Sequence, residues 1–185
     1  ALEEAAPWVT VEPADDPAAM AATALAEGEM VGWFQGRGEF GPRALGGRCI
    51  LADPRDPNAA DRLNEAVKKR ETFRPFAPAV LSEEAESWFP GATPSPYMSL
   101  TVPVAENKRS SIPAVVADDG TARIQTLDPE SSPDLHSVAT AFQQKAGIPM
   151  ILNTSFNTRG EPIVENPEDA LTTFLDSGLD LLLLE

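Results

Sequence analysis

The chain of 185 residues has one cysteine and one histidine, and it has half as many basic as acidic residues. With Cys49 alone, no intramolecular disulfide framework can form, which is typical of a reducing cytoplasm. With His136 alone, a metal site built from several histidines is excluded. No apolar run approaches the ~18 residues of a membrane span, and no signal peptide pattern opens the chain. We therefore expect a cytoplasmic protein that does not bind membranes.

Basic residues are scarce and unevenly placed. The chain has 14 Lys and Arg against 29 Asp and Glu, for a formal net charge of -15, which disfavours nucleic-acid binding. Nine of the 14 bases nevertheless fall in residues 32–76, beside only six acids. This basic segment has two explanations. It is either a solvated surface with ion pairs or a compact anion site, because clustered arginines bind phosphate with two parallel hydrogen bonds.

The length and composition fit one α/β domain of the mixed, α+β kind. Residues 1–14 are predicted to be a linker or the tail of an upstream domain, and residues 15–185 the domain itself. Helices are predicted at 17–27, 58–70, 82–89, 133–145 and 166–178. Strands are predicted at 29–35, 49–52, 97–104, 121–127, 149–152 and 179–184. Residues 71–81 are expected to be extended, because prolines exclude a helix there, and residues 106–113 to form a polar loop.

Residues 36–48 contain five glycines and predict a long loop. Its G-x-G-x-x-G pattern is not a dinucleotide fingerprint, because no crossover helix fits before the next strand, and no Walker motif occurs. The loop carries Arg37, Arg43 and Arg48. It could therefore bring backbone amides and guanidinium groups together around an anion, with Glu39 pairing with one of these arginines to hold the shape.

Two further clusters permit either a structural or a ligand-binding role. Lys68, Lys69 and Arg70 lie near the end of a predicted helix, where cations are favourable without any ligand. Arg74 lies among aromatic and proline residues, so we expect it to be partly buried and to need an anionic partner, either a ligand or Glu71.

Residues 153–160 carry six polar side chains directly after a buried strand. They form either a solvated turn or a ligand site, because α/β folds bind ligands at the carboxyl ends of strands. No G-x-S-x-G nucleophile motif is present. We therefore predict a structural role for His136, and we predict that Cys49 is a small buried residue.

Four segments together resemble a known family. They are GRGEFGPRALGGRCILADPRDP, KKRETFRPFAPAVL, DGTARIQTL and LNTSFNTRGEPIVENPEDA. In this order and spacing they are similar to the C-terminal domain of the NodU/CmcH family of O-carbamoyltransferases, over residues 20–185. The resemblance implies a single YrdC-like domain, with a twisted mixed sheet and flanking helices, as in threonylcarbamoyl-adenylate synthases.

The resemblance also implies a reaction. ATP and carbamoyl phosphate would bind in this domain, and a carbamate oxygen would attack the α-phosphorus to give carbamoyl adenylate and pyrophosphate. An ASKHA-type partner domain, normally N-terminal on the same chain, would transfer the carbamoyl group to a hydroxyl in natural-product biosynthesis. Mg²⁺ would arrive with ATP, because the motifs contain no carboxylate cage for a metal.

The resemblance assigns site residues in three groups. Those expected to hold phosphate or carbamoyl groups are Arg43, Lys68, Arg74 and Arg123. Those expected to contact the nucleotide or adenylate are Ser155 and Asn157, with Arg37, Arg70 and Arg159 as second-rank candidates. The family's KxR and SxN signatures correspond to residues 68–70 and 155–157. The chain departs from the family pattern at three positions, which are Gly38, Cys49 and Ala117 (usually a large residue, a serine and a histidine).

Two alternative functions remain. One is a stand-alone carbamoyl-adenylate or threonylcarbamoyl-adenylate synthase, and the other is a nucleotide- or RNA-binding module without chemistry. If Arg43 and Lys68 hold substrate, we expect Arg43→Ala and Lys68→Ala to weaken substrate binding and leave thermal stability nearly unchanged.

Overall fold

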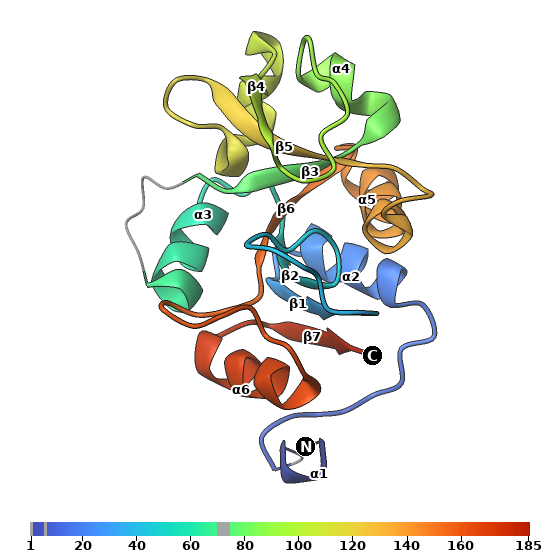
Figure 1. Cartoon of the computed structure of the whole chain (residues 1–185), viewed down its shortest axis with the longest axis vertical. Helices are drawn as coiled ribbons and strands as arrows, with labels where there is room; N and C mark the ends of the chain where they lie inside the picture. Colours follow the sequence, from blue (N-terminus) through green and yellow to red (C-terminus); the bar gives the residue numbers. More distant parts are fainter. Residues whose placement is uncertain (1, 6, 70–74) are drawn as a thin grey trace.

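The computed structural model of the protein describes residues 2–5, 7–69 and 75–185. Within these residues, seven strands form one sheet in the order β4-β5-β3-β6-β2-β1-β7, which runs from top to bottom in Figure 1. The strands are β1 (Val31–Phe34), β2 (Arg48–Ala52), β3 (Ala77–Leu81), β4 (Leu100–Pro103), β5 (Thr121–Leu127), β6 (Met150–Ser155) and β7 (Leu181–Leu184). Strand β3 is parallel to β5 and β1 is parallel to β7, whereas the other neighbours are antiparallel. The mixed sheet expected from the sequence is confirmed.

Helices flank this sheet on both sides. The described α-helices are α1 (Leu2–Ala5), α2 (Pro17–Ala26), α3 (Ala59–Arg62), α4 (Ala85–Trp88), α5 (Pro133–Ala146) and α6 (Pro167–Ser177). Helices α2 and α5 pack against each other on one side, and α3 and α6 lie on the other (Figure 1). Among the described residues, no helix is long and apolar enough to cross a membrane.

The ends of the longer helices follow local capping chemistry. The Asp16 side chain accepts a hydrogen bond of 2.9 Å from the amide of Ala19 at the start of α2. Asn166 and Asp169 form a reciprocal capping box at the start of α6. Helix α5 ends at Gly147, whose φ of 73° is readily adopted by glycine. These positions agree with the predicted helix boundaries because the signals are local.

The predicted helix over 58–70 is regular only in its first turn. After α3 the chain continues as a π-helical stretch, η1 (Leu63–Lys68), and ends at Lys69 in the left-handed region with φ of 44°. Non-glycine residues adopt this region at a cost, and such strain is concentrated at functional sites. Residues 106–113 also differ from the expected loop, because Glu106–Ser111 forms 3₁₀ turns.

The core contains large side chains from both sides of the sheet, including the fully buried Phe142 and Phe156. Gly32 in β1 makes room for the Phe156 ring, whose Cζ lies 3.0 Å from where a Cβ on Gly32 would be. Glycine is therefore required at this strand position by close packing.

The N-terminal segment lies outside the layers of the sheet and helices. Helix α1 is beyond the β7 end of the sheet in Figure 1, and residues 9–14 have no regular secondary structure. That residues 1–14 form a linker or the tail of another domain stays a prediction.

Replacing Phe156 with alanine should remove a large buried side chain and leave a cavity against Gly32. We expect the free energy of unfolding to fall by about 3–5 kcal/mol, as is usual for such core truncations. Urea denaturation measures this change. The control is Phe40→Ala, because Phe40 is fully exposed and its loss should change stability by less than about 0.5 kcal/mol. Equal stability of the two variants would contradict the described packing.

Candidate functional site

One face of the sheet carries polar side chains from two strands. Arg123 and Gln125 are two residues apart on β5, and Asn153 and Ser155 are two residues apart on β6, so each pair points to a single face. Strand β3 lies between them, and two of its residues of the same parity pair with Gln125 and Asn153. All four polar side chains therefore share one face.

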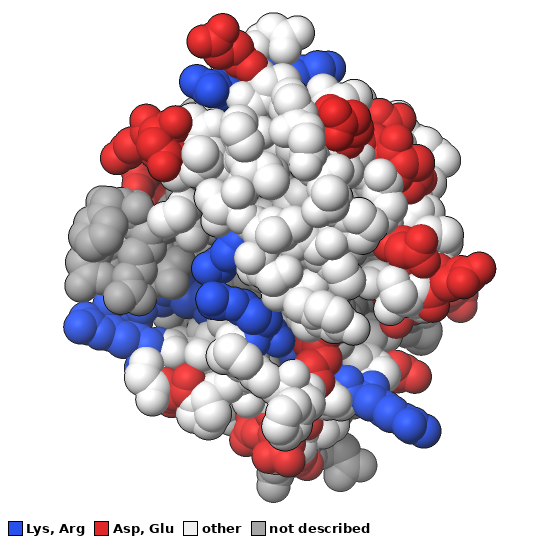
Figure 2. Space-filling model, turned by 45° about the horizontal axis from the view of Figure 1, so that its top comes forward, with Lys and Arg blue, Asp and Glu red and all other residues white. Residues whose placement is uncertain are grey.

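A cavity of about 320 Å³ lies on this face, bordered by the glycine-rich loop. Its walls include Arg43 from the loop, Phe76 from the segment before β3, Arg123 from β5, and Asn153 and Ser155 from β6. Figure 2 shows Lys and Arg side chains around a hollow near the middle of one face, with Asp and Glu mainly toward the rim. The fold thus brings distant cationic and polar residues to one cavity.

Arg43 and Arg123 are placed in this cavity without an internal anion. Among the described residues neither side chain forms an ion pair, and Nε of Arg123 is buried with no hydrogen-bond partner. Burial, and after it the positive charge of Arg43, lower the pKa of the Arg123 guanidinium. Because arginine remains protonated in proteins, this lowered pKa reflects a charge that is partly removed from water and, secondly, lies near the charge of Arg43, and a bound anion would offset both effects.

Lys68 joins the helical stretch η1 to the end of β6. Its Nζ donates hydrogen bonds to the Ser155 carbonyl, to the Asn157 carbonyl at 3.0 Å and to Asn157 Oδ1 at 2.7 Å, and it lies 3.3 Å from Ser155 Oγ. Lys68 is only 6% exposed. The two signature segments expected to share a site therefore do meet, and Lys68 holds the backbone that carries Ser155 and Asn157.

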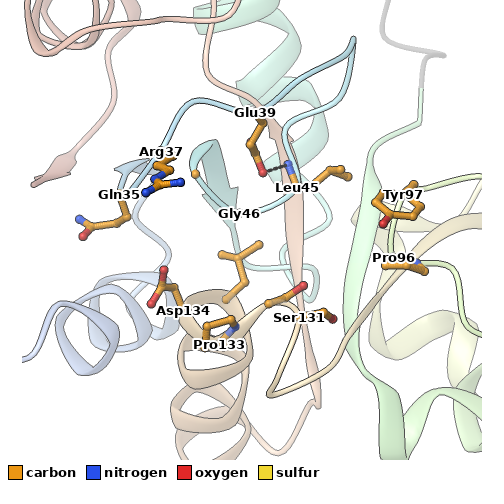
Figure 3. Close-up of a pocket in the computed structure, with 14 residues that line it drawn as sticks. Gln35, Arg37, Glu39, Leu45, Gly46, Pro96, Tyr97, Ser131, Pro133 and Asp134 are labelled. Carbon is orange, nitrogen blue, oxygen red and sulfur yellow. Dashed lines mark hydrogen bonds between the residues drawn. The ribbon is translucent and has the colours of Figure 1, made fainter.

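Arg37 lies in a different pocket, of about 350 Å³, with Glu39, Tyr97 and Asp134 (Figure 3). Oε1 of Glu39 accepts a hydrogen bond of 2.9 Å from the amide of Leu45. Within the described part of the chain Glu39 forms no ion pair with an arginine, so that expectation is wrong. The Glu39 side chain instead holds the shape of the loop by binding the backbone amide of Leu45.

Arg48, the third arginine of the loop, is a structural residue. Its Nη1 donates to the carbonyls of Gln35 and Gly47 at 2.8 Å each, and its guanidinium lies 3.6 Å from the centre of the Phe34 ring. Arg48 is 5% exposed. It therefore holds the two ends of the loop together and does not line the cavity.

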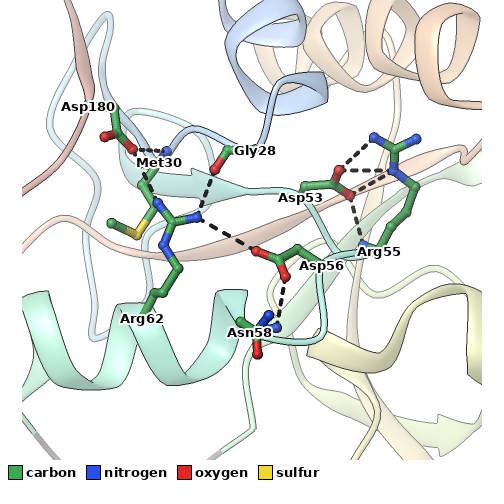
Figure 4. A network of polar contacts seen from close by, with 8 residues as sticks. All are labelled: Gly28, Met30, Asp53, Arg55, Asp56, Asn58, Arg62 and Asp180. Atoms are coloured by element: carbon green, nitrogen blue, oxygen red, sulfur yellow. Dashed lines mark hydrogen bonds and ion pairs between the residues drawn. The ribbon is translucent and has the colours of Figure 1, made fainter.

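Two more arginines of the basic segment bind acids of the fold (Figure 4). Arg55 forms an ion pair with Asp53, with 2.7 Å between Nη2 and Oδ2. Arg62 donates to the Gly28 carbonyl at 2.9 Å, and its Nη2 is 3.5 Å from an oxygen of Asp180. The ion-pair explanation of the basic segment thus holds for these residues, and the anion-site explanation is supported for Arg43.

The remaining predicted site residues are only partly described. Arg70 and Arg74 lie outside the described residues. Arg159, in the loop after β6, donates a hydrogen bond of 2.9 Å to the Lys69 carbonyl, next to the left-handed turn. Arg159 therefore helps Lys68 to connect the end of η1 to the loop after β6, but it does not line the cavity.

The structural roles predicted for Cys49 and His136 agree with their surroundings. Cys49 is fully buried, and burial raises the pKa of its thiol. His136 Nε2 lies 3.3 Å from Glu83 Oε1 at the molecular surface. At Ala117, where the resemblance led us to expect a histidine, the backbone forms hydrogen bonds with Thr121 and Gly120 in the turn before β5.

Sequence reasoning missed Gln125 as a member of this face and placed Asn153 in a loop. Strand β6 in fact continues through Ser155, so Asn153 is a strand residue whose side chain is buried. The signal that could have found both is their spacing of two from Arg123 and Ser155, because alternate strand residues share a face.

Replacing Lys68 with methionine should destabilise the protein, in contrast to the expectation from the sequence that Lys68→Ala leaves thermal stability nearly unchanged. The partly buried oxygens of Ser155 and Asn157 would lose the Lys68 ammonium as a donor, at about 1–3 kcal/mol. The control is Lys69→Met, because Lys69 is exposed and keeps a non-glycine side chain at the same turn. Urea denaturation should give a lower free energy of unfolding for Lys68→Met than for Lys69→Met. Equal values would contradict a stabilising role for the Lys68 hydrogen bonds.

Residues 22–185 match the protein family described as Carbamoyltransferase C-terminus. The chain is 49% identical over 179 residues to nodulation protein NolNO of Sinorhizobium fredii, covering 95% of this chain and 26% of that protein. It is 47% identical over 177 residues to nodulation protein NolO of Bradyrhizobium diazoefficiens, covering 94% of this chain and 32% of that protein. The chain thus spans about a quarter to a third of the length of these relatives.

Solved structures show the same fold at low sequence identity. Full-length HypF in its phosphate- and nucleotide-bound form superposes with a TM-score of 0.62 at 23% identity, covering 95% of this chain and 22% of HypF. E. coli YciO gives a TM-score of 0.61 at 16% identity, covering 92% of this chain and 78% of YciO. The expected YrdC-like fold is confirmed by these neighbours. With a family match over residues 22–185 and relatives near 50% identity, the chain belongs to the carbamoyltransferase C-terminal family.

Proposed function

We propose that this domain binds ATP and carbamoyl phosphate and forms carbamoyl adenylate, as the adenylate-forming part of an O-carbamoyltransferase. The observation that carries the proposal is the pair Arg43 and Arg123, which line one cavity and have no ion-pair partner among the described residues. Guanidinium groups bind phosphate with strong, directional hydrogen bonds. Family membership makes a phosphorylated carbamoyl donor and ATP the natural anions for this position.

The proposal gives each residue of the site a role. Arg43 and Arg123 bind phosphate oxygens and neutralise charge that develops during the reaction. Ser155 and Asn157 contact the nucleotide or the adenylate, and Lys68 holds their backbone in place. Arg74 stays a proposed phosphate or carbamoyl ligand, and Arg37, Arg70 and Arg159 stay second-rank candidates for contact with the nucleotide or adenylate.

The proposed reaction needs positioning and charge stabilisation more than a nucleophilic side chain. Carbamoyl phosphate loses its phosphate to water and leaves carbamate. A carbamate oxygen then bonds to the α-phosphorus of ATP, while the bond from that phosphorus to pyrophosphate breaks. Among the described residues that line the cavity none is a carboxylate. Mg²⁺ would therefore be held by the phosphates of ATP, where it would neutralise their charge.

The partner is proposed from the length of the relatives, because this chain corresponds to 26% of NolNO and 32% of NolO. We assign the transfer step to an ASKHA-type domain N-terminal to this one. That domain would select the hydroxyl acceptor, a natural product in this proposal. We place the protein in the cytoplasm in this proposal, because both ATP and carbamoyl phosphate occur there. The proposal has no nucleic-acid partner, because the net charge of -15 disfavours binding to a polyanion.

Arg43→Ala should reduce pyrophosphate release from ATP in the presence of carbamoyl phosphate. Loss of one charged hydrogen bond is worth about 1.5–3 kcal/mol, or about ten- to a hundredfold in kcat/KM. Arg43 is exposed, so the unfolding midpoint should not change. Lys145→Ala, on the exposed end of α5, is the control and should retain full activity.

The same assay separates the alternatives. If the protein binds ATP but releases no pyrophosphate, the result would support the alternative that this domain is a nucleotide-binding module without catalytic activity. Release that requires L-threonine and bicarbonate, in place of carbamoyl phosphate, would indicate a threonylcarbamoyl-adenylate synthase. If wild-type protein neither binds ATP nor releases pyrophosphate, the proposed function is wrong for this chain.

A further inference from the structure

Two buried amide side chains cross the middle of the sheet beside the cavity. Gln125 is 0% exposed and Asn153 is 1% exposed, and Nδ2 of Asn153 donates a hydrogen bond of 2.8 Å to Oε1 of Gln125. Strand β3 runs between them, with Ala79 opposite Gln125 and Ala77 opposite Asn153. These small alanines leave the space above β3 in which the two amides meet.

Both amides also bind the backbone of the glycine-rich loop. Nε2 of Gln125 donates to the Leu45 carbonyl at 2.6 Å, and Nδ2 of Asn153 donates to the Ala44 carbonyl at 3.1 Å. Each side chain reaches more than 75 residues along the sequence to do so. The amides therefore tie the loop to the centre of the sheet immediately after Arg43.

The next two carbonyls of the loop are held in the same way. Nε1 of Trp33 in β1 donates to the Gly46 carbonyl at 2.8 Å, and Arg48 in β2 donates to the Gly47 carbonyl. Four consecutive carbonyls, from residues 44 to 47, thus accept from side chains of four different strands.

The glycine-rich loop contributes to two pockets. Leu45, Gly46 and Gly47 line the pocket that contains Arg37. Pro42, Arg43 and Ala44 of the same loop line the cavity that contains Arg123.

We infer that Gln125 and Asn153 are positioning residues that set where the Arg43 guanidinium lies relative to Arg123 and Ser155. Arg43 is exposed and has no hydrogen bond or ion pair of its own in the described part of the chain. Its location therefore depends on the backbone to which it is attached. The inference rests on the proposed function, because it assigns these amides to the binding of the phosphorylated substrate through Arg43.

A purely structural role would have a different signature. A buried polar pair that only stabilises the fold would affect substrate binding equally whether or not Arg43 is present. A pair that acts through Arg43 loses its effect on binding when the guanidinium is removed, because residues in one network are not additive.

The test is a double-mutant cycle between Gln125→Met and Arg43→Ala. Methionine keeps the length of the glutamine side chain but can neither donate to Leu45 nor accept from Asn153 effectively. The measurements are the dissociation constant of ATP by calorimetry and kcat/KM for carbamoyl phosphate by pyrophosphate release. We expect Gln125→Met to lower kcat/KM about tenfold in the wild-type background and less than about twofold in the Arg43→Ala background. Gln144→Met, on the exposed side of α5, is the matched control.

If Gln125→Met lowers kcat/KM by the same factor in the wild-type and Arg43→Ala backgrounds, the inference is overturned and the proposed function is left intact. A wild-type chain without ATP binding or pyrophosphate release would overturn the proposed function, and this inference with it. If Gln125→Met does not fold, the cycle is run with Gln125→Glu. This variant keeps the side-chain size and an acceptor for Asn153 but places a carboxylate oxygen against the Leu45 carbonyl. The fold-loss of kcat/KM caused by Gln125→Glu is then compared between the wild-type and Arg43→Ala backgrounds, with the same criterion.

Discussion

The register of strand β6 determines the direction of the polar side chains on which the candidate site depends. This strand pairs with β2 on one side and β3 on the other, and so joins the two halves of the sheet. A shift of one residue would turn Asn153 and Ser155 to the opposite face. Ile151 and Leu152 are fully buried on the two faces of the strand, so apolar burial alone selects the register weakly. The two hydrogen bonds donated by Nδ2 of Asn153 favour the observed register, because an unpaired buried N–H group is costly.

Local chemistry explains which parts of the structure could be predicted from sequence. Asp16 and Asn166 cap helices where expected, because a cap needs only residues three positions away. The meeting of Lys68 with Ser155 and Asn157 followed from the family resemblance. The π-helical stretch before Lys69 was not predictable. It belongs to a segment whose buried ammonium binds oxygens 87 and 89 residues further along the chain, and no local pattern reports such a contact.

Charge counting located the segment that contains Arg43 but could not separate Arg43 from the structural arginines beside it. Arg48, Arg55 and Arg62 lie in the basic segment, yet carbonyls and acids of the fold already bind them. Arg123 lies outside that segment, in an acidic stretch, and still shares the cavity with Arg43. The presence or absence of a carbonyl or carboxylate partner among the described residues of the fold distinguishes the two groups, and such partners depend on three-dimensional contacts rather than on spacing along the sequence.

The attachment of four successive loop carbonyls to four strands has a thermodynamic consequence. A loop with five glycines would normally lose much conformational entropy when a ligand orders it. For residues 44–47, which include two of the five glycines, that entropy is lost once, when the sheet forms. Preorganisation of this kind strengthens binding without adding a contact. Under the proposed function, ligand affinity at this cavity would be coupled to the integrity of the sheet, and conditions that loosen the central strands should weaken binding before the protein unfolds.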